Sequence, residues 1–192
     1  MNTSLINAIF RDAEKDNRFF LLEHEFYRLL SVMGIKIPDH VFIKKGQPLP
    51  EKEIKSISSK NLVLKIVSPQ IIHKSDVGGV RFVKNEIEEV ERSVSGMFED
   101  IPESYRNWIE KSSGKILSLE DIEQEIRGIL VVEAVEHEQE GFGSELLIGL
   151  RNTREFGPVV TMGAGGTDVE YMSGHLKPGR ALAIASAPVS YT

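Results

Sequence analysis

The sequence contains no cysteine among its 192 residues. A disulfide framework, a thiolate zinc site and a cysteine nucleophile are therefore all excluded. Aromatic residues are few, at 7% of the chain, and Trp108 is the only tryptophan. No apolar run approaches the roughly 20 residues of a membrane-spanning helix, and the amino terminus lacks the basic start and long apolar stretch of a secretory signal. We therefore expect a cytoplasmic protein with no membrane partner.

Basic residues are too few and too scattered to indicate a nucleic-acid surface. Lys and Arg number 23 against 29 Asp and Glu, which gives a formal net charge of -6, and the two signs are interspersed. Nonspecific nucleic-acid binding depends on a basic surface that neutralises phosphates. We therefore expect no nucleic-acid partner, although a few lysines that converge with backbone amides can still bind a small phosphorylated ligand.

Hydrophobic residues make up 41% of the chain, which is enough for one globular domain or two small lobes. Apolar residues at three- and four-residue steps predict a helix over residues 21–33, with a shorter helix before it over residues 5–10. Asn85, with Glu88 three residues later, has the pattern of a capping box at the start of a helix whose apolar face reaches Met97.

Strands are predicted from apolar runs bounded by polar, glycine- or proline-containing segments. The run over residues 61–67 is rich in β-branched residues and favours a strand buried on both faces. The other predicted strands cover residues 41–43, 80–83, 128–135, 145–150 and 169–172. Helices and strands mix without a regular βαβ alternation, which indicates an α+β or α/β fold with two lobes.

Two segments have less regular patterns. Residues 99–125 are rich in charge, serine and glycine, and we expect a surface excursion with a helix over residues 119–126. Residues 181–187 have a weakly amphipathic, alanine-rich pattern that predicts a helix.

Lys65 is the most informative single residue. The alternation of a strand places it on one face with Val63 and Val67. An ammonium group among apolar residues needs an anionic partner, because an unpaired buried charge is costly, and a nucleotide phosphate can supply that partner. Two other interpretations stay open, in which the lysine extends to solvent at a sheet edge or pairs with a local carboxylate.

The loop after this strand carries Lys74 and the glycine pair Gly78 and Gly79. Glycines let backbone amides approach phosphate oxygens, so the strand, loop and strand together predict a phosphate-binding unit; an ordinary hairpin turn is the alternative. The same loop carries His73, whose imidazole is either a nucleophile toward phosphorus, a proton carrier or a solvated loop residue.

Two carboxylates and a glycine cluster are further candidates. Glu133 lies near the end of a predicted strand, where it can accept from ribose hydroxyls or the adenine amino group while the next backbone atoms contact the base. Glu145 opens a later strand, and either carboxylate can instead be a solvated charge. The glycines of residues 163–166 predict a ligand loop or a flexible turn.

Residues 63–80, VLKIVSPQIIHKSDVGGV, closely resemble the signature of the ATP-grasp domain in NDP-forming acetyl-CoA synthetases, to which the β subunit of succinyl-CoA ligase is related. Three further segments are similar to the family in the same order, namely residues 21–38, 128–135 and 145–166. Glu23 and Gly34 stand at matching places in the first of these. The resemblance extends to about residue 190.

This resemblance implies an ATP-grasp fold. The resemblance also implies a division into an N-terminal helical extension (1–20), a first lobe (21–130) with an inserted segment near 99–125, and a hinge with part of a second lobe (131–192). The nucleotide-binding residues that we expect are Lys65, Lys74, Ser75, Gly78, Gly79, Glu133, Ala134, Val135 and Glu145. His73 matches a loop histidine that relays phosphate, so it is the expected catalytic residue.

The function implied by the resemblance is that of an acid–thiol ligase. The family converts acyl-CoA, ADP and phosphate to the acid, CoA and ATP through a phosphohistidine. ATP or ADP and Mg²⁺ are the expected cofactors, and a CoA-binding subunit or domain is the expected partner in an oligomer.

The chain also departs from the family. Asn152-Thr153-Arg154 stands where the family has Arg-Asp-Pro, and Ala185 stands where it has an arginine. The asparagine-proline motif and later aspartate that hold magnesium in the family have no counterpart here, so we expect the chain alone to be incomplete for catalysis and to hold no metal ligands. Two alternatives stay open: a non-catalytic nucleotide-sensing or assembly module, and a carboxylate-amine ligase of the same fold.

Overall fold

A computed structural model describes residues 3–135, 145–166 and 183–186, together with residues 175 and 177. The chain divides into two compact units, Met1–Val135 and Glu136–Thr192, here called unit 1 and unit 2. Among the described residues, no helix has the length and apolar character needed to cross a membrane.

Unit 1 is built on a four-stranded sheet of order β1-β4-β2-β3 in which all neighbours are antiparallel. The strands are β1 (His40–Lys44), β2 (Asn61–Val67), β3 (Val80–Lys84) and β4 (Gly128–Glu133). Each agrees with a predicted strand. The register aligns Lys65 of β2 with Val80 of β3 and Leu130 of β4, so this lysine lies in the interior of the sheet.

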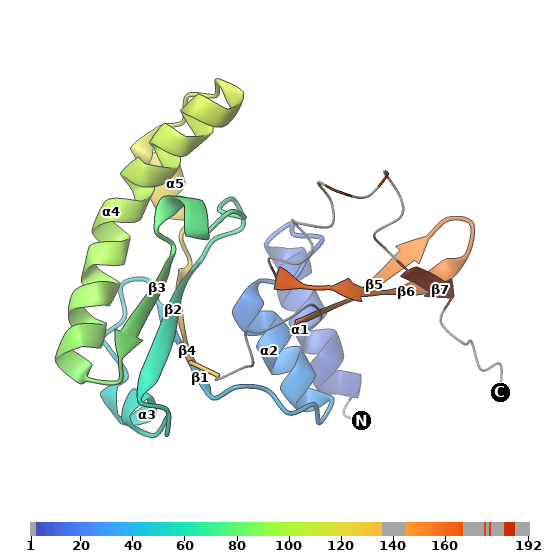
Figure 1. Ribbon diagram of the computed structural model, residues 1–192, viewed down its shortest axis with the longest axis horizontal. Coiled ribbons are helices and arrows are strands. Elements are labelled where there is room, and N and C mark those ends of the chain that lie inside the picture. Colours follow the sequence, from blue (N-terminus) through green and yellow to red (C-terminus); the bar gives the residue numbers. More distant parts are fainter. Residues whose placement is uncertain (1–2, 136–144, 167–174, 176, 178–182, 187–192) are drawn as a thin grey trace. The chain divides into compact units, whose positions relative to one another are not determined.

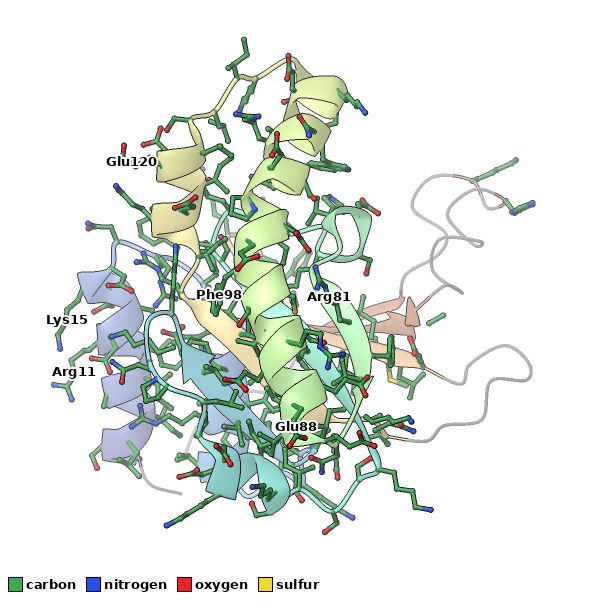
Figure 2. All side chains as sticks on the ribbon, turned by 90° about the vertical axis from the view of Figure 1, so that its left-hand side faces the viewer. Arg11, Lys15, Arg81, Glu88, Phe98 and Glu120 are labelled. Atoms are coloured by element: carbon green, nitrogen blue, oxygen red, sulfur yellow. The ribbon has the colours of Figure 1, made fainter. Side chains whose placement is uncertain are left out.

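Helices cover both faces of this sheet. They are α1 (Thr3–Lys15), α2 (Glu23–Val32), α3 (Glu51–Lys55), the 3-10 turn η1 (Ser75–Val77), α4 (Ile87–Ser113) and α5 (Leu119–Glu125). α4 and α5 lie on one face of the sheet, and α2 lies on the other (Figure 1). Figure 2 looks onto α4, beside which Arg81 of β3 pairs with Asp100 at 2.9 Å.

The predicted strand over residues 61–67 is confirmed, but its two faces are buried unequally. Leu62, Leu64 and Ile66 are all 0% exposed in the larger core beneath α4. On the other face Val63 and Lys65 are only half-buried. The prediction of burial on both faces is therefore wrong at Val63 and Lys65, because α2 covers that face incompletely.

The expected surface excursion over residues 99–125 is also corrected. α4 continues to Ser113, and the residues that it buries are Val90, Val94, Met97, Ile101, Pro102 and Tyr105. The apolar spacing of three and four residues continues past Met97, so the second half of the helix packs on the same core as the first. The helix expected near residues 119–126 is confirmed as α5, with Ser118 accepting from the Asp121 N–H at 3.0 Å.

The predicted capping box at Asn85 is wrong. α4 begins after Glu86, which is its N-cap residue and makes no side-chain cap hydrogen bond. The Asn85 side-chain amide instead donates to the carbonyl oxygens of Ile57 and Ser59, at 2.8 and 3.0 Å. These carbonyls need donors in a partly buried loop, and that need determines the orientation of the amide.

Unit 2 contains a three-stranded antiparallel sheet of order β5-β6-β7. The strands are β5 (Leu146–Thr153), β6 (Gly157–Ala164) and β7 (Ala183–Ser186). Thr153, at a position where the chain departs from the family, closes the β5–β6 turn: its hydroxyl donates to the Gly157 carbonyl at 3.0 Å and accepts from the Phe156 N–H at 3.1 Å.

The predicted helix over residues 181–187 is wrong where the structure describes it. Residues 183–186 form β7, which pairs with β6 from Ala183↔Met162 to Ser186↔Val159. The backbone ladder with β6 outweighs the helix preference of alanine, which is a weak contribution per residue. The strand expected over residues 169–172 lies outside the described residues.

Candidate functional site

The loop between β2 and β3 folds back onto β2 because of its two glycines. Gly78 ends η1 with a φ of 70°, a left-handed conformation that favours glycine. Gly79 has no room for a side chain, since a Cβ would lie 2.7 Å from Ile66 Cγ2 and 2.9 Å from the Lys74 carbonyl oxygen. The Ile66 N–H donates to the Gly79 carbonyl at 2.8 Å. This packing holds Lys74 close to the strand that carries Lys65.

The amides of the glycine pair donate within the loop itself. The Gly79 N–H donates to the Lys74 carbonyl at 2.7 Å, and the Gly78 N–H donates to the Ser75 carbonyl at 3.3 Å. The glycines therefore have a conformational role in this state of the chain. A direct contact of Ser75, Gly78 or Gly79 with phosphate stays a prediction.

Lys65 and Lys74 converge on one carboxylate, that of Glu23. Lys65 Nζ donates to Glu23 Oε1 at 2.8 Å, and Lys74 Nζ donates to Glu23 Oε2 at 2.5 Å. The exposed fractions of these side chains are 29% for Lys65, 21% for Lys74 and 24% for Glu23. Of the alternatives for Lys65, pairing with a local carboxylate is therefore observed. The cluster combines two positive charges with one negative charge in a partly shielded position.

Glu23 is placed by the first turn of α2. The neighbouring carboxylate of Glu25 accepts from the Leu22 N–H at 2.7 Å, which satisfies an amide at the helix start. Glu25 also forms a two-pronged pair with Arg18, with Nη1–Oε2 at 2.8 Å and Nη2–Oε1 at 2.6 Å. Arg18 is 7% exposed and further donates to the Phe20 carbonyl at 3.0 Å. This clamp fixes the helix start, where the helix dipole favours carboxylates.

The electrostatics of the cluster keep Glu23 ionised. Burial alone raises the pKa of the Glu23 carboxyl, but hydrogen bonds from Lys65 and Lys74 and their charges outweigh it, so the pKa lies below its ordinary value of 4.5. Tyr27 of α2 packs on the same face of the sheet, and burial raises the pKa of its phenol. At neutral pH the cluster therefore holds a carboxylate between two ammonium groups.

His73 extends toward α4. Its ring centroid lies 5.4 Å from that of Trp108, with an interplanar angle of 36°. Tyr105, one helical turn before Trp108, donates its hydroxyl to the Gln70 carbonyl at 3.1 Å. Adjacent residues of the loop thus contact helices on opposite faces of the sheet, His73 with α4 and Lys74 with α2. Sequence reasoning missed Trp108 as a neighbour of the loop.

The predicted base-binding segment lies at the end of β4. Glu133 is half-buried, and Val135 is 57% exposed. The Ala134 N–H donates to the Asn61 carbonyl at 3.0 Å, and its carbonyl accepts from the Ser59 hydroxyl at 3.4 Å. Both backbone groups of Ala134 are therefore paired, one with the first residue of β2 and one with the segment just before it. The contact of this segment with a base and ribose stays a prediction.

In unit 2 the structure brings Glu145 and the glycine cluster together. The β5–β6 register aligns Leu146 with Ala164, and the Gly165 N–H donates to the Glu145 carbonyl at 2.8 Å. Gly166 has a φ of 57°, and a Cβ at this position would overlap the Glu145 carboxylate. The two features that the sequence suggests separately therefore form one corner of the sheet.

The described residues hold no group of three or more His, Asp or Glu side chains arranged to bind a metal ion.

A family model of the ATP-grasp domain matches residues 12–190. The chain belongs to the ATP-grasp family. Its fold of mixed helices and antiparallel sheets is the fold of that family, whose members bind ATP or ADP with Mg²⁺.

Relatives of this ATP-grasp chain are named ADP-forming CoA ligases. The 4-hydroxybutyrate–CoA ligase (ADP-forming) of Nitrosopumilus maritimus is 34% identical over 173 residues, which cover 90% of this chain and 21% of that protein. The acetate–CoA ligase (ADP-forming) I subunit beta of Pyrococcus furiosus is 30% identical over 168 residues, which cover 85% of this chain and 60% of the subunit. The chain therefore spans only part of the length of these relatives.

A solved structure agrees with this assignment. The dinucleotide forming acetyl-coenzyme A synthetase 1 of Ca. Korarchaeum cryptofilum, in complex with coenzyme A and Mg-AMPPCP, matches with a TM-score of 0.59 and 29% identity. The match covers 95% of this chain and 64% of that one, whose phosphohistidine segment points towards the nucleotide binding site.

Proposed function

We propose that this ATP-grasp segment binds ADP or ATP as the nucleotide-binding part of an ADP-forming acyl-CoA synthetase. The observation that carries the proposal is the convergence of Lys65 and Lys74, from two elements of unit 1, on a single point. Two ammonium groups at one point are suited to a diphosphate or triphosphate, which offers several negatively charged oxygens. Partial burial strengthens that attraction relative to open water.

The remaining expected contacts follow the order of the chain. Lys65 and Lys74 bind the phosphates, and the loop residues Ser75, Gly78 and Gly79 make further contacts with them. Glu133, Ala134 and Val135 line the adenine and ribose site, and Glu145 is a further nucleotide-binding residue. The match of the chain to the ATP-grasp family over residues 12–190 supports these assignments.

The proposed reaction of the complete system converts acyl-CoA, ADP and phosphate to the acid, CoA and ATP through a phosphohistidine. A CoA-binding domain or subunit supplies CoA, which is consistent with a relative named as a beta subunit. His73 relays the phosphoryl group within the ATP-grasp part, and the exposure of its side chain supports that role. Mg²⁺ offsets the charge of the phosphates during transfer, and the proposal assigns it no ligand in the described residues.

Isothermal titration of the chain with ADP and Mg²⁺ tests the binding step. We expect saturable binding that weakens by about tenfold or more in Lys65→Ala, because one of the two phosphate partners is removed. Lys55→Ala is the matched control, since Lys55 pairs with Glu51 on the exposed surface of α3, with 61% and 55% of their side chains exposed. A folded chain that binds no nucleotide, or a Lys65→Ala variant with unchanged affinity, would overturn the proposal.

A second experiment tests turnover. The chain is mixed with a CoA-binding synthetase subunit, an acyl-CoA, ADP, Mg²⁺ and phosphate, and ATP is measured. ATP formation that is lost in Lys65→Ala supports the ligase assignment. ATP formation by this mixture would also eliminate the alternative of a module that only senses nucleotide or assists assembly.

A further inference from the structure

We propose that Glu23 is an internal counter-ion that takes the place of a phosphate on Lys65 and Lys74, and that a nucleotide binds by displacing it. This inference rests on the proposed function and goes beyond it by naming the group that limits nucleotide affinity. Both carboxylate oxygens of Glu23 are engaged, one by each lysine, at 2.8 and 2.5 Å.

The carboxylate resembles a phosphate in the features that a lysine recognises. Each of its oxygens carries negative charge and accepts a charge-assisted hydrogen bond, as phosphate oxygens do. The lysines come from β2 and from the loop that Gly78 and Gly79 fold over that strand, so their convergence is set by the backbone. An anion that replaces Glu23 therefore meets both ammonium groups in place.

The partial burial of the cluster explains why an internal partner is present. The side chains of Lys65 and Lys74 are 29% and 21% exposed, and ammonium groups withdrawn from water are costly without an anion. Glu23 supplies that anion when no nucleotide is bound. A nucleotide must then compete with it, so the apparent affinity equals the intrinsic affinity multiplied by the fraction of molecules in which the lysines are free of Glu23.

The contacts around Glu23 indicate that only its own side chain moves when a phosphate replaces it on the lysines. Glu25, two residues later, is committed to Arg18 and to the Leu22 N–H, which keeps the first turn of α2 in place. Because of these contacts, Glu25 cannot replace Glu23 as the partner of the two lysines when Glu23 is altered. Rotation of the Glu23 side chain is therefore sufficient to free both lysines while α2 stays where it is.

The direction of a mutational effect separates this role from a purely structural one. If Glu23 only arranges the lysines, its loss disorders them and weakens nucleotide binding. If Glu23 competes with phosphate, its neutral isostere releases the lysines and strengthens binding. The Glu23→Gln substitution keeps the size of the side chain and removes its charge.

Titration of wild type and Glu23→Gln with ADP and Mg²⁺, and separately with inorganic tripolyphosphate, tests the proposal. We expect Glu23→Gln to bind both about threefold to tenfold more tightly, because the competitor is removed for any polyphosphate regardless of a base. Glu51→Gln, from the exposed pair with Lys55, is the control and should bind as wild type does. Circular dichroism establishes that each variant is folded.

Unchanged or weaker binding by folded Glu23→Gln overturns this inference. The proposed function still stands after such a result if wild type binds ADP and Lys65→Ala does not. If wild type binds no nucleotide, both the proposed function and this inference fail. If Glu23→Gln does not fold, Glu23→Asp replaces it, since the shorter carboxylate cannot reach both lysines and should give a smaller gain in affinity. An Asp variant without any gain is equally decisive against the counter-ion role.

Discussion

The two faces of the four-stranded sheet in unit 1 are built from the same strands but bury different chemistry. Beneath α4 the face presents Leu62, Leu64 and Ile66, each 0% exposed, in the larger hydrophobic core. Beneath α2 the next residues along the same strand, Val63 and Lys65, are half-buried, and the lysine pairs with a carboxylate. The alternation of side chains along β2 therefore places closely packed residues on the α4 face and a charged residue on the α2 face.

This difference shows how one strand can stabilise the fold and carry a site. Close packing makes the α4 face sensitive to the loss of a methylene group. The α2 face tolerates charge because its helix start and its two lysines satisfy one another. The following predictions test this division, from the largest expected effect to the smallest.

Leu64→Ala should lower the free energy of unfolding by about 2–5 kcal/mol, because a fully buried leucine leaves a cavity that the core does not fill. Val63→Ala, on the neighbouring position of the same strand, should cost clearly less, since Val63 is half-buried. Urea unfolding followed by far-ultraviolet circular dichroism measures both. Equal losses would mean that the two faces are packed alike.

Tyr105→Phe should lower the free energy of unfolding by about 0.5–1.5 kcal/mol, the net contribution of one hydrogen bond. The ring stays buried in the α4 core, and only the hydroxyl that donates to the Gln70 carbonyl is lost. Amide hydrogen exchange should become faster in residues 70–79 relative to β2. Unchanged exchange in that loop would contradict the role of α4 as its support.

The stability difference between wild type and Glu23→Gln should depend on pH in the acid range. The pKa of Glu23 in the folded chain lies below its ordinary value of 4.5, so the ionised carboxylate stabilises the fold in full above that value. The contribution is lost as the pH falls through the folded pKa, where Glu23 takes up its proton. Unfolding in urea across the acid range measures this, and a difference that stays constant would show that the lysines do not stabilise the carboxylate.

The lysine and glycine unit could be predicted because its members lie in one short segment. Lys65, Lys74 and the glycine pair are joined by a strand and a loop, and their spacing alone indicates that they meet. Glu23 is 42 residues from Lys65 and 51 from Lys74. No periodicity relates such distant positions, so the resemblance drew attention to Glu23 but gave no reason for its place.

Two errors in secondary structure have different causes. The continuation of α4 could have been found, because Met97, Ile101, Tyr105 and Trp108 maintain a helical spacing; the interspersed charges and Pro102 concealed it. The strand at residues 183–186 could not have been found from the sequence, since its pairing with β6 depends on a partner more than twenty residues earlier along the chain. The roles of Glu133 and Glu145 depend on a bound nucleotide, which no residue pattern supplies, and they stay predictions.

The contact between His73 and Trp108 gives the chain an optical reporter of its own. Trp108 is the only indole in the sequence, so its emission comes from one place, 5.4 Å from the imidazole. Withdrawal of the loop that carries His73 would separate the two rings and would therefore change the brightness of the protein without any added label.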